Sequence, residues 1–130
     1  MLSDGAAPVI FVTCEGVSAP KGAASMELRC DGGGRIEPHA ILAALSARGL
    51  NRVLVEGGAE TLARFIDAGA LDELHLMLAP IVLGSGKTGL NLSPIETLDE
   101  ALRPIVRTMR FRDGDMLCMC EMQGQAVARL

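Results

Sequence analysis

The chain has 130 residues, of which 49% are hydrophobic, and a formal net charge of −4. This length favours a single domain with its own core, and the hydrophobic share excludes a disordered chain. The acidic balance argues against a nucleic-acid partner, which requires a basic surface. The longest apolar run, residues 74–83, is too short for a membrane span and contains His75 and Pro80. The first residues lack the pattern of a secretory signal, so we expect a cytoplasmic protein with no membrane partner.

The first part of the chain predicts two strands and a helix. Residues 8–13 (PVIFVT) form an apolar, β-rich run that is typical of a buried strand, and residues 26–30 (MELRC) alternate as a shorter one. Residues 38–48 have the apolar spacing of a helix. Pro38 suits its first turn and Gly49 its end.

Together with the strand at 26–30 and the helix at 38–48, the middle of the chain predicts a β-α-β-α-β pattern. Residues 52–56 form a short apolar run that favours a strand covered on both faces, residues 59–68 a helix, and residues 74–83 a long strand. Connections of helix length predict parallel strands with right-handed crossovers.

The last part predicts a different arrangement. Residues 90–102 are expected to be mostly irregular. Strand-like runs at residues 105–111 and 116–122 flank an Asp-Gly pair, which is a hairpin signal. We therefore expect an α/β fold, mainly a parallel sheet with flanking helices and an antiparallel C-terminal hairpin. Residues 123–130 are expected to be a loose tail.

The four cysteines form no CxxC pair, and the two histidines are not at a zinc-like spacing. In a cytoplasmic setting we interpret the cysteines as reduced thiols that serve as small core residues, and we expect no metal site. Cys118 and Cys120 would share one strand face with Met116 and Met122.

The motif Glu56-Gly57-Gly58 lies where a predicted strand becomes a helix. Two glycines there remove the side chains from the helix amides, whose positive dipole end is a seat for phosphate. Glu56, on the last strand residue, would face a ligand bound beside that seat. The alternative is a plain connection in which glycine serves tight packing and Glu56 accepts hydrogen bonds from nearby groups.

The remaining motifs are weaker indications of function. The run at 84–88 (GSGKT) resembles the end of a P-loop, but position 81 is Ile where that motif needs glycine, and no helix pattern follows. We expect a surface turn or a glycine-rich loop over a ligand. His75 is interpreted as a half-buried histidine satisfied by Glu73, and His39 as solvent-facing. Four arginines favour a solvated sheet edge that discourages aggregation: Arg103, Arg107, Arg110 and Arg112.

Three blocks of the chain, at 51–62, 69–74 and 79–86, resemble the reductase domain of bacterial riboflavin biosynthesis, which has the dihydrofolate reductase fold. That domain is usually the C-terminal half of a bifunctional pyrimidine deaminase–reductase. The resemblance extends over residues 8–122. It is limited to the C-terminal portion of the domain, so we expect a partial reductase domain that is truncated at its N-terminus. The zinc signature of the deaminase is absent.

The resemblance implies an NADPH-dependent reduction of 5-amino-6-(5-phosphoribosylamino)uracil, with a small pyrimidine as substrate. It assigns the cofactor phosphates to Gly57, Gly58, Ala59, Glu60, Thr61 and Leu62. Glu56 would contact the substrate, and no residue is assigned as catalytic. Thr13 and Cys14 are possible neighbours of the adenosine end of the cofactor.

Three hypotheses about the function stay open. The chain is either a reductase or a non-catalytic fragment that keeps the dinucleotide-binding scaffold and forms a homo-oligomer, expected to be a dimer. In the second case, apolar surface left uncovered would drive self-association. An unrelated nucleotide-binding α/β domain is a third reading.

Overall fold

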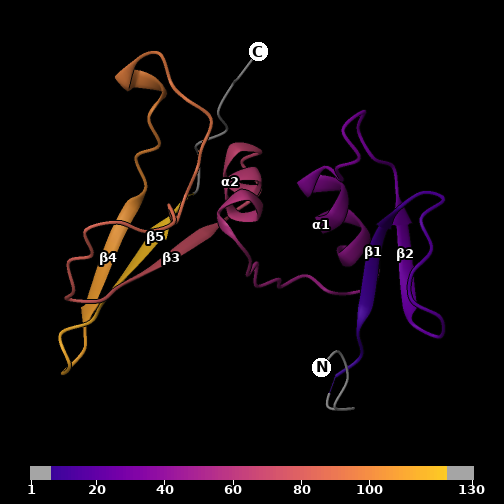
Figure 1. The fold of residues 1–130 in the computed structure, drawn as a ribbon, viewed down its shortest axis with the longest axis horizontal. Helices are drawn as coiled ribbons and strands as arrows, with labels where there is room; N and C mark the ends of the chain where they lie inside the picture. The colour runs from indigo at the N-terminus through magenta and orange to yellow at the C-terminus, as the bar shows by residue number, and fades with distance from the viewer. Residues whose placement is uncertain (1–6, 123–130) are drawn as a thin grey trace. The chain divides into compact units, whose positions relative to one another are not determined.

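A computed structural model describes residues 7–122 and divides the chain into two compact units, Met1–Leu54 and Val55–Leu130 (Figure 1). Each unit is described by itself below. The predicted tail at 123–130 lies outside the described residues, and the prediction of a single domain stays a prediction. Within residues 7–122, no helix has the length and apolar character needed to cross a membrane.

The first unit contains a parallel strand pair followed by a helix. Strand β1 (Ile10–Cys14) pairs with β2 (Ala24–Leu28), and their register places Cys14 opposite Leu28. Helix α1 (Pro38–Ser46) begins with proline as predicted, and the Glu37 carboxylate caps it by accepting a hydrogen bond of 2.9 Å from the Ala40 amide. The two predicted strands and the helix are confirmed with bounds shifted by a few residues.

The prediction of four reduced cysteines is wrong for two of them. Cys14 and Cys30 form a disulfide, with their Cα atoms 5.4 Å apart. The parallel register explains why they meet: Cys30 follows the strand partner of Cys14 by only two residues. Local sequence cannot show this proximity, because it depends on strand pairing between separated segments. Cys118 and Cys120 are free, as predicted.

The second unit is a helix and a three-stranded antiparallel sheet, shown in Figure 1. Its sheet order is β3-β5-β4, with β5 in the centre. The elements are α2 (Ala59–Asp67), β3 (Glu73–Leu78), a 3-10 turn η1 (Leu98–Glu100), β4 (Ile105–Arg110) and β5 (Met116–Glu121). The predicted hairpin is β4–β5, and residues 90–102 are mostly irregular, as predicted.

The buried side chains of the second unit come from two elements. Ala63, Phe65 and Ile66 of α2 are buried, as is Cys120 of β5. Phe65 and Ile66 therefore supply large buried apolar side chains of this helix, while Leu62 is half-buried. Strand β4 lies at the sheet edge with every residue exposed, as predicted for the strand that carries Arg107 and Arg110.

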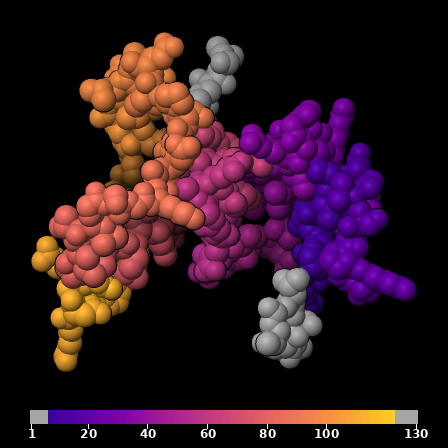
Figure 2. Space-filling view, in the orientation of Figure 1, coloured from indigo at the N-terminus to yellow at the C-terminus, as the bar shows by residue number. Residues whose placement is uncertain are grey.

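Two predicted strand segments differ in the structure. Residues 52–56 form no strand, and Leu54 is 81% exposed rather than covered on both faces. The predicted strand at 74–83 ends at Leu78, and Val82 beyond it is 99% exposed. Pro80 has no amide to donate to a strand ladder, which explains the early end. Figure 2 shows the salmon and orange segment that follows β3 spread over the surface of the second unit.

The turn between β4 and β5 requires glycine at position 114. Gly114 has φ +97°, and a Cβ atom there would lie 3.1 Å from Cγ of Pro80. Its amide donates to the Phe111 carbonyl at 3.1 Å, and Phe111 in turn donates to the Asp115 carbonyl at 2.8 Å. The turn therefore depends on a backbone conformation that L side chains rarely adopt.

We predict that Gly114→Ala lowers the free energy of unfolding by about 1–2 kcal/mol, because it combines a left-handed φ with a close contact to Pro80. Urea denaturation followed by far-UV circular dichroism measures the change. Gly86→Ala is the control, since Gly86 has an ordinary φ and nothing within 4 Å of an added Cβ. An equal loss in both variants would contradict the role given to Gly114.

Candidate functional site

The candidate site is the turn that leads into α2. Glu56 and Gly57 precede the helix, and Gly58 is its N-cap residue with φ −74° and ψ 171°. The first helical turn then supplies Ala59, Glu60, Thr61 and Leu62. All seven predicted site residues are therefore contiguous and belong to the second unit.

The two glycines differ in what they do for the fold. A Cβ atom at Gly57 would lie 3.0 Å from Cβ of Thr61 and 3.2 Å from its Oγ1, so the turn passes close to the helix there. A Cβ at Gly58 would meet nothing within 4 Å, and its φ is ordinary. The packing explanation for glycine therefore holds at Gly57 and not at Gly58. Thr61 causes this difference, because its side chain packs against Gly57. In the sequence, only the position of Thr61 about one helical turn after Gly57 indicates this contact.

The start of α2 has no side-chain cap. Its first intrahelical bond runs from the Leu62 amide to the Gly58 carbonyl at 3.2 Å. The amides of Ala59 and Thr61 have no acceptor within the helix, and the helix dipole adds partial positive charge at this end. This arrangement suits an anion such as a phosphate. Glu60 stabilises the same dipole, and a phosphate has to bind on the side away from its carboxylate.

The Glu56 side chain is exposed, and within residues 7–122 it has no hydrogen-bond or ion-pair partner. The alternative role, a structural acceptor for neighbouring amides, has no support in this part of the chain. A carboxylate that is solvated beside uncapped amides is available to a ligand that carries hydroxyl or amino groups.

The far end of α2 is tied to the loop that follows β3. The Asp67 carboxylate accepts a hydrogen bond of 2.7 Å from the Ser93 hydroxyl and one of 3.1 Å from the Ser93 amide. This contact was not evident from the sequence, because the residues are 26 positions apart. The glycine-rich run at 84–89 is exposed and leads to the 3-10 turn η1 rather than to a helix, so it lacks P-loop geometry.

The other candidates take simple roles. The His75 Nε2 atom lies 2.9 Å from a Glu73 carboxylate oxygen, which confirms the predicted partner, but His75 is exposed rather than half-buried. In the first unit, Cys14 is in the disulfide, and the buried Thr13 hydroxyl has no hydrogen-bond partner among the described residues. No group of three or more His, Cys, Asp or Glu side chains in residues 7–122 forms a metal site.

Comparison with known proteins shows which family the chain resembles. The RibD C-terminal domain family matches residues 1–113. The riboflavin biosynthesis protein RibD of Bacillus amyloliquefaciens is 37% identical over 91 residues, which is 65% of this chain and 24% of that protein. The chain thus spans about a quarter of the length of this curated relative.

A crystal structure from Thermotoga maritima has a similar fold. It is a diaminohydroxyphosphoribosylaminopyrimidine deaminase/5-amino-6-(5-phosphoribosylamino)uracil reductase, 23% identical, with a TM-score of 0.66 over 91% of this chain and 32% of that one. This likeness confirms the predicted α/β, dihydrofolate reductase-like fold class. The family match includes the turn at 56–58 and α2, and the chain belongs to the RibD C-terminal domain family.

Proposed function

We propose that this chain is part of the reductase domain of an NADPH-dependent pyrimidine reductase of riboflavin biosynthesis. The substrate would be 5-amino-6-(5-phosphoribosylamino)uracil, which becomes the corresponding ribityl compound. The family match and the RibD relative support the pathway, and the turn into α2 supports a phosphate-bearing cofactor. Because the substrate and cofactor are water-soluble phosphates, we also propose a cytoplasmic setting.

One observation carries the proposal: neither the φ of Gly58 nor a close contact requires glycine at this N-cap position. Its φ is −74°, and an added Cβ atom would meet nothing within 4 Å apart from its chain neighbours. What glycine provides instead is open space in front of the uncapped amides of α2. That space is what a cofactor phosphate needs in order to reach the helix start.

The residues present fit one part of the cofactor. The amides at the start of α2 would hold its phosphates, with Gly57 and Gly58 keeping the approach open. NADPH, when bound, supplies the hydride that reduces the ribosyl carbon. The protein binds and orients the two molecules, and Glu56 would face the substrate beside the phosphate seat.

We predict that NADPH binds the purified chain and that Gly58→Val weakens this binding at least tenfold, or about 1.4 kcal/mol. A branched side chain would fill the space in front of the helix amides. Titration followed by the fluorescence of NADPH measures the affinity, and the absence of Trp and Tyr keeps the protein background low.

Controls separate binding from folding. Gly58→Val should stay folded, because an added Cβ atom meets nothing within 4 Å and the change costs about 1 kcal/mol or less at an N-cap. Gly86→Val, in an exposed loop outside the turn, should bind NADPH as the parent chain does. Unchanged affinity in a folded Gly58→Val variant would remove the phosphate seat from the proposal.

We predict that Glu56→Gln weakens pyrimidine binding about tenfold and leaves NADPH binding unchanged, because a carboxylate accepts stronger hydrogen bonds than an amide. Isothermal titration with the pyrimidine substrate in saturating NADPH measures the first quantity. Glu96→Gln, an exposed acid outside the turn, is the matched control. Equal loss of both ligands would show that Glu56 belongs to the cofactor site.

A second candidate function is a non-catalytic, homo-oligomeric scaffold, with a dimer as the expected state. The observation that favours it is exposed apolar surface within the second unit. Met77 is 60% exposed, Ile81 68% and Ile105 69%. Self-association removes exposed apolar side chains of this kind from water.

We predict that sedimentation equilibrium at micromolar concentration gives a mass near twice the 13.6 kDa of one chain. Ile105→Lys, on the exposed edge strand β4, should shift the equilibrium toward the monomer, because it places a charge on apolar surface. A parent chain that sediments as a single monomer would count against the oligomer and leave the NADPH prediction untouched.

A further inference from the structure

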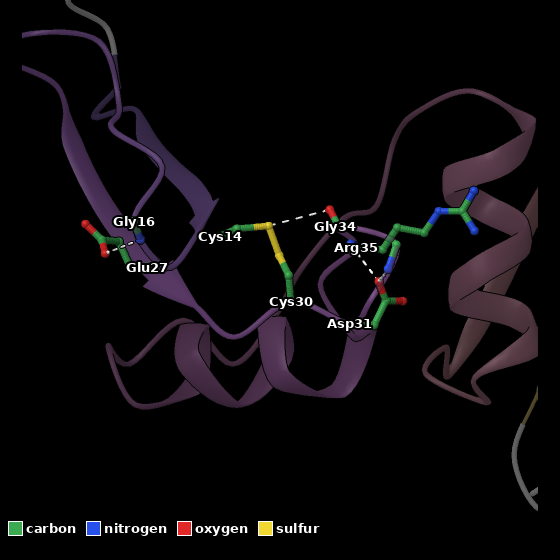
Figure 3. Close-up of a disulfide and its surroundings, with 8 residues drawn as sticks. Cys14, Gly16, Glu27, Cys30, Asp31, Gly34 and Arg35 are labelled. Carbon is green, nitrogen blue, oxygen red and sulfur yellow. Dashed lines mark hydrogen bonds between the residues drawn. A yellow bond between two sulfur atoms is a disulfide. The ribbon is translucent and has the colours of Figure 1, made fainter.

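The disulfide between Cys14 and Cys30 lies at the carboxyl end of the parallel strand pair. Cys14 is the last residue of β1, and Cys30 follows the end of β2 (Figure 3). Because β1 and β2 run in the same direction, the bond crosses the carboxyl ends of both strands. Cys30 also pairs with Ile36 in an isolated bridge, so it lies at the base of the turn that connects β2 to α1.

That turn is built around Asp31. Its carboxylate accepts hydrogen bonds of 2.9 Å from the amides of Gly33 and Arg35, and its carbonyl accepts one of 3.0 Å from Gly34. Gly34 has φ +73°, and its carbonyl oxygen lies 3.5 Å from Sγ of Cys14. In the reduced form, the Cys14 thiol would be placed to donate a weak hydrogen bond to that oxygen. The disulfide therefore links the start of the turn at 31–35 covalently to the end of β1.

Neither cysteine of the disulfide is fully buried. Cys14 and Cys30 are both half-buried, and the segments beside them, including Glu15, Gly16 and residues 31–35, are exposed. Cys120, in contrast, is 5% exposed. A disulfide that a dissolved thiol can reach exchanges with it, and in a reducing compartment such bonds serve sensing more often than permanent support.

We propose that Cys14 and Cys30 form a reversible thiol–disulfide couple that responds to low-molecular-weight thiols such as glutathione. In oxidation, the thiolate of one cysteine attacks glutathione disulfide and releases one glutathione thiolate. The second cysteine thiolate then attacks the mixed disulfide and releases another glutathione. The protein loses two electrons and two protons, and one glutathione disulfide becomes two glutathione molecules. Reduction by two glutathione molecules reverses these steps and frees the turn at 31–35.

The first test counts thiols. The chain is equilibrated in buffers of varied ratio of glutathione to glutathione disulfide, quenched with acid, alkylated under denaturing conditions and weighed by mass spectrometry. We expect two alkylated cysteines in oxidising buffer and four in reducing buffer, with the transition inside the range of ratios. Trypsin cleavage after the exposed Lys21 should leave two peptides joined by the bond in the oxidised form only.

The outcomes are separate. A pair that stays reduced at every ratio, or stays oxidised in excess glutathione, overturns the proposal. So does a bond that includes Cys118 or Cys120. Cys118→Ser is the control variant and should titrate as the parent chain does, while Cys30→Ser should show no two-electron transition and no joined peptides.

The second test asks whether the disulfide restrains the turn at 31–35. Limited trypsin digestion of the native chain should cleave after Arg29 and Arg35 severalfold faster when the pair is reduced or when Cys30 is Ser, because the turn is then released from β1. Cleavage after Lys87, in an exposed loop of the other unit, is the internal control and should not change. If the cleavage rates at Arg29 and Arg35 are equal in both redox states, the disulfide does not restrain the turn, even if the couple is reversible.

Discussion

The second unit depends on β5, the only strand in the described part of the chain that is paired along both edges. It aligns Cys118 with Leu76 on one side and with Thr108 on the other. Beyond the strand, the Met122 amide donates to the Asp72 carbonyl at 2.8 Å, which extends the ladder to the segment after α2. Without β5, neither β3 nor β4 has a partner for its backbone groups. The helix that carries the candidate site is therefore followed by a sheet that forms only once β5 is in place.

Features set by neighbouring residues could be predicted from the sequence. Pro38 and Gly49 mark the ends of α1, and the Asp-Gly pair marks the β4–β5 hairpin, because these signals act within one turn of the chain. Features set by distant segments could not. The disulfide partner of Cys14 follows from the register of β1 and β2, and residues 52–56, although apolar, pair with no strand in the described residues.

The candidate site lies between these cases. Its place in the chain was readable, since a Gly-Gly pair before an amphipathic helix indicates exposed amides. The division of work between the glycines was not, because it depends on how closely the turn approaches Thr61. Gly57 is explained by its close packing against Thr61, and Gly58 has no such contact. A glycine that packing does not explain is the more informative about a ligand, so Gly58 is the residue on which the proposed phosphate site depends.

The two proposed functions place different demands on the second unit. Met77, Ile81 and Ile105 are exposed, and an oligomer would gain free energy by covering them. The phosphate site at Gly58 has to stay open to solvent. A second copy that covers the apolar side chains and also reaches Gly58 would compete with the cofactor, and by linkage the cofactor would weaken the oligomer by the same factor. A copy that stops short of Gly58 would leave both equilibria independent, and reductase and oligomer would then be compatible descriptions of the same chain.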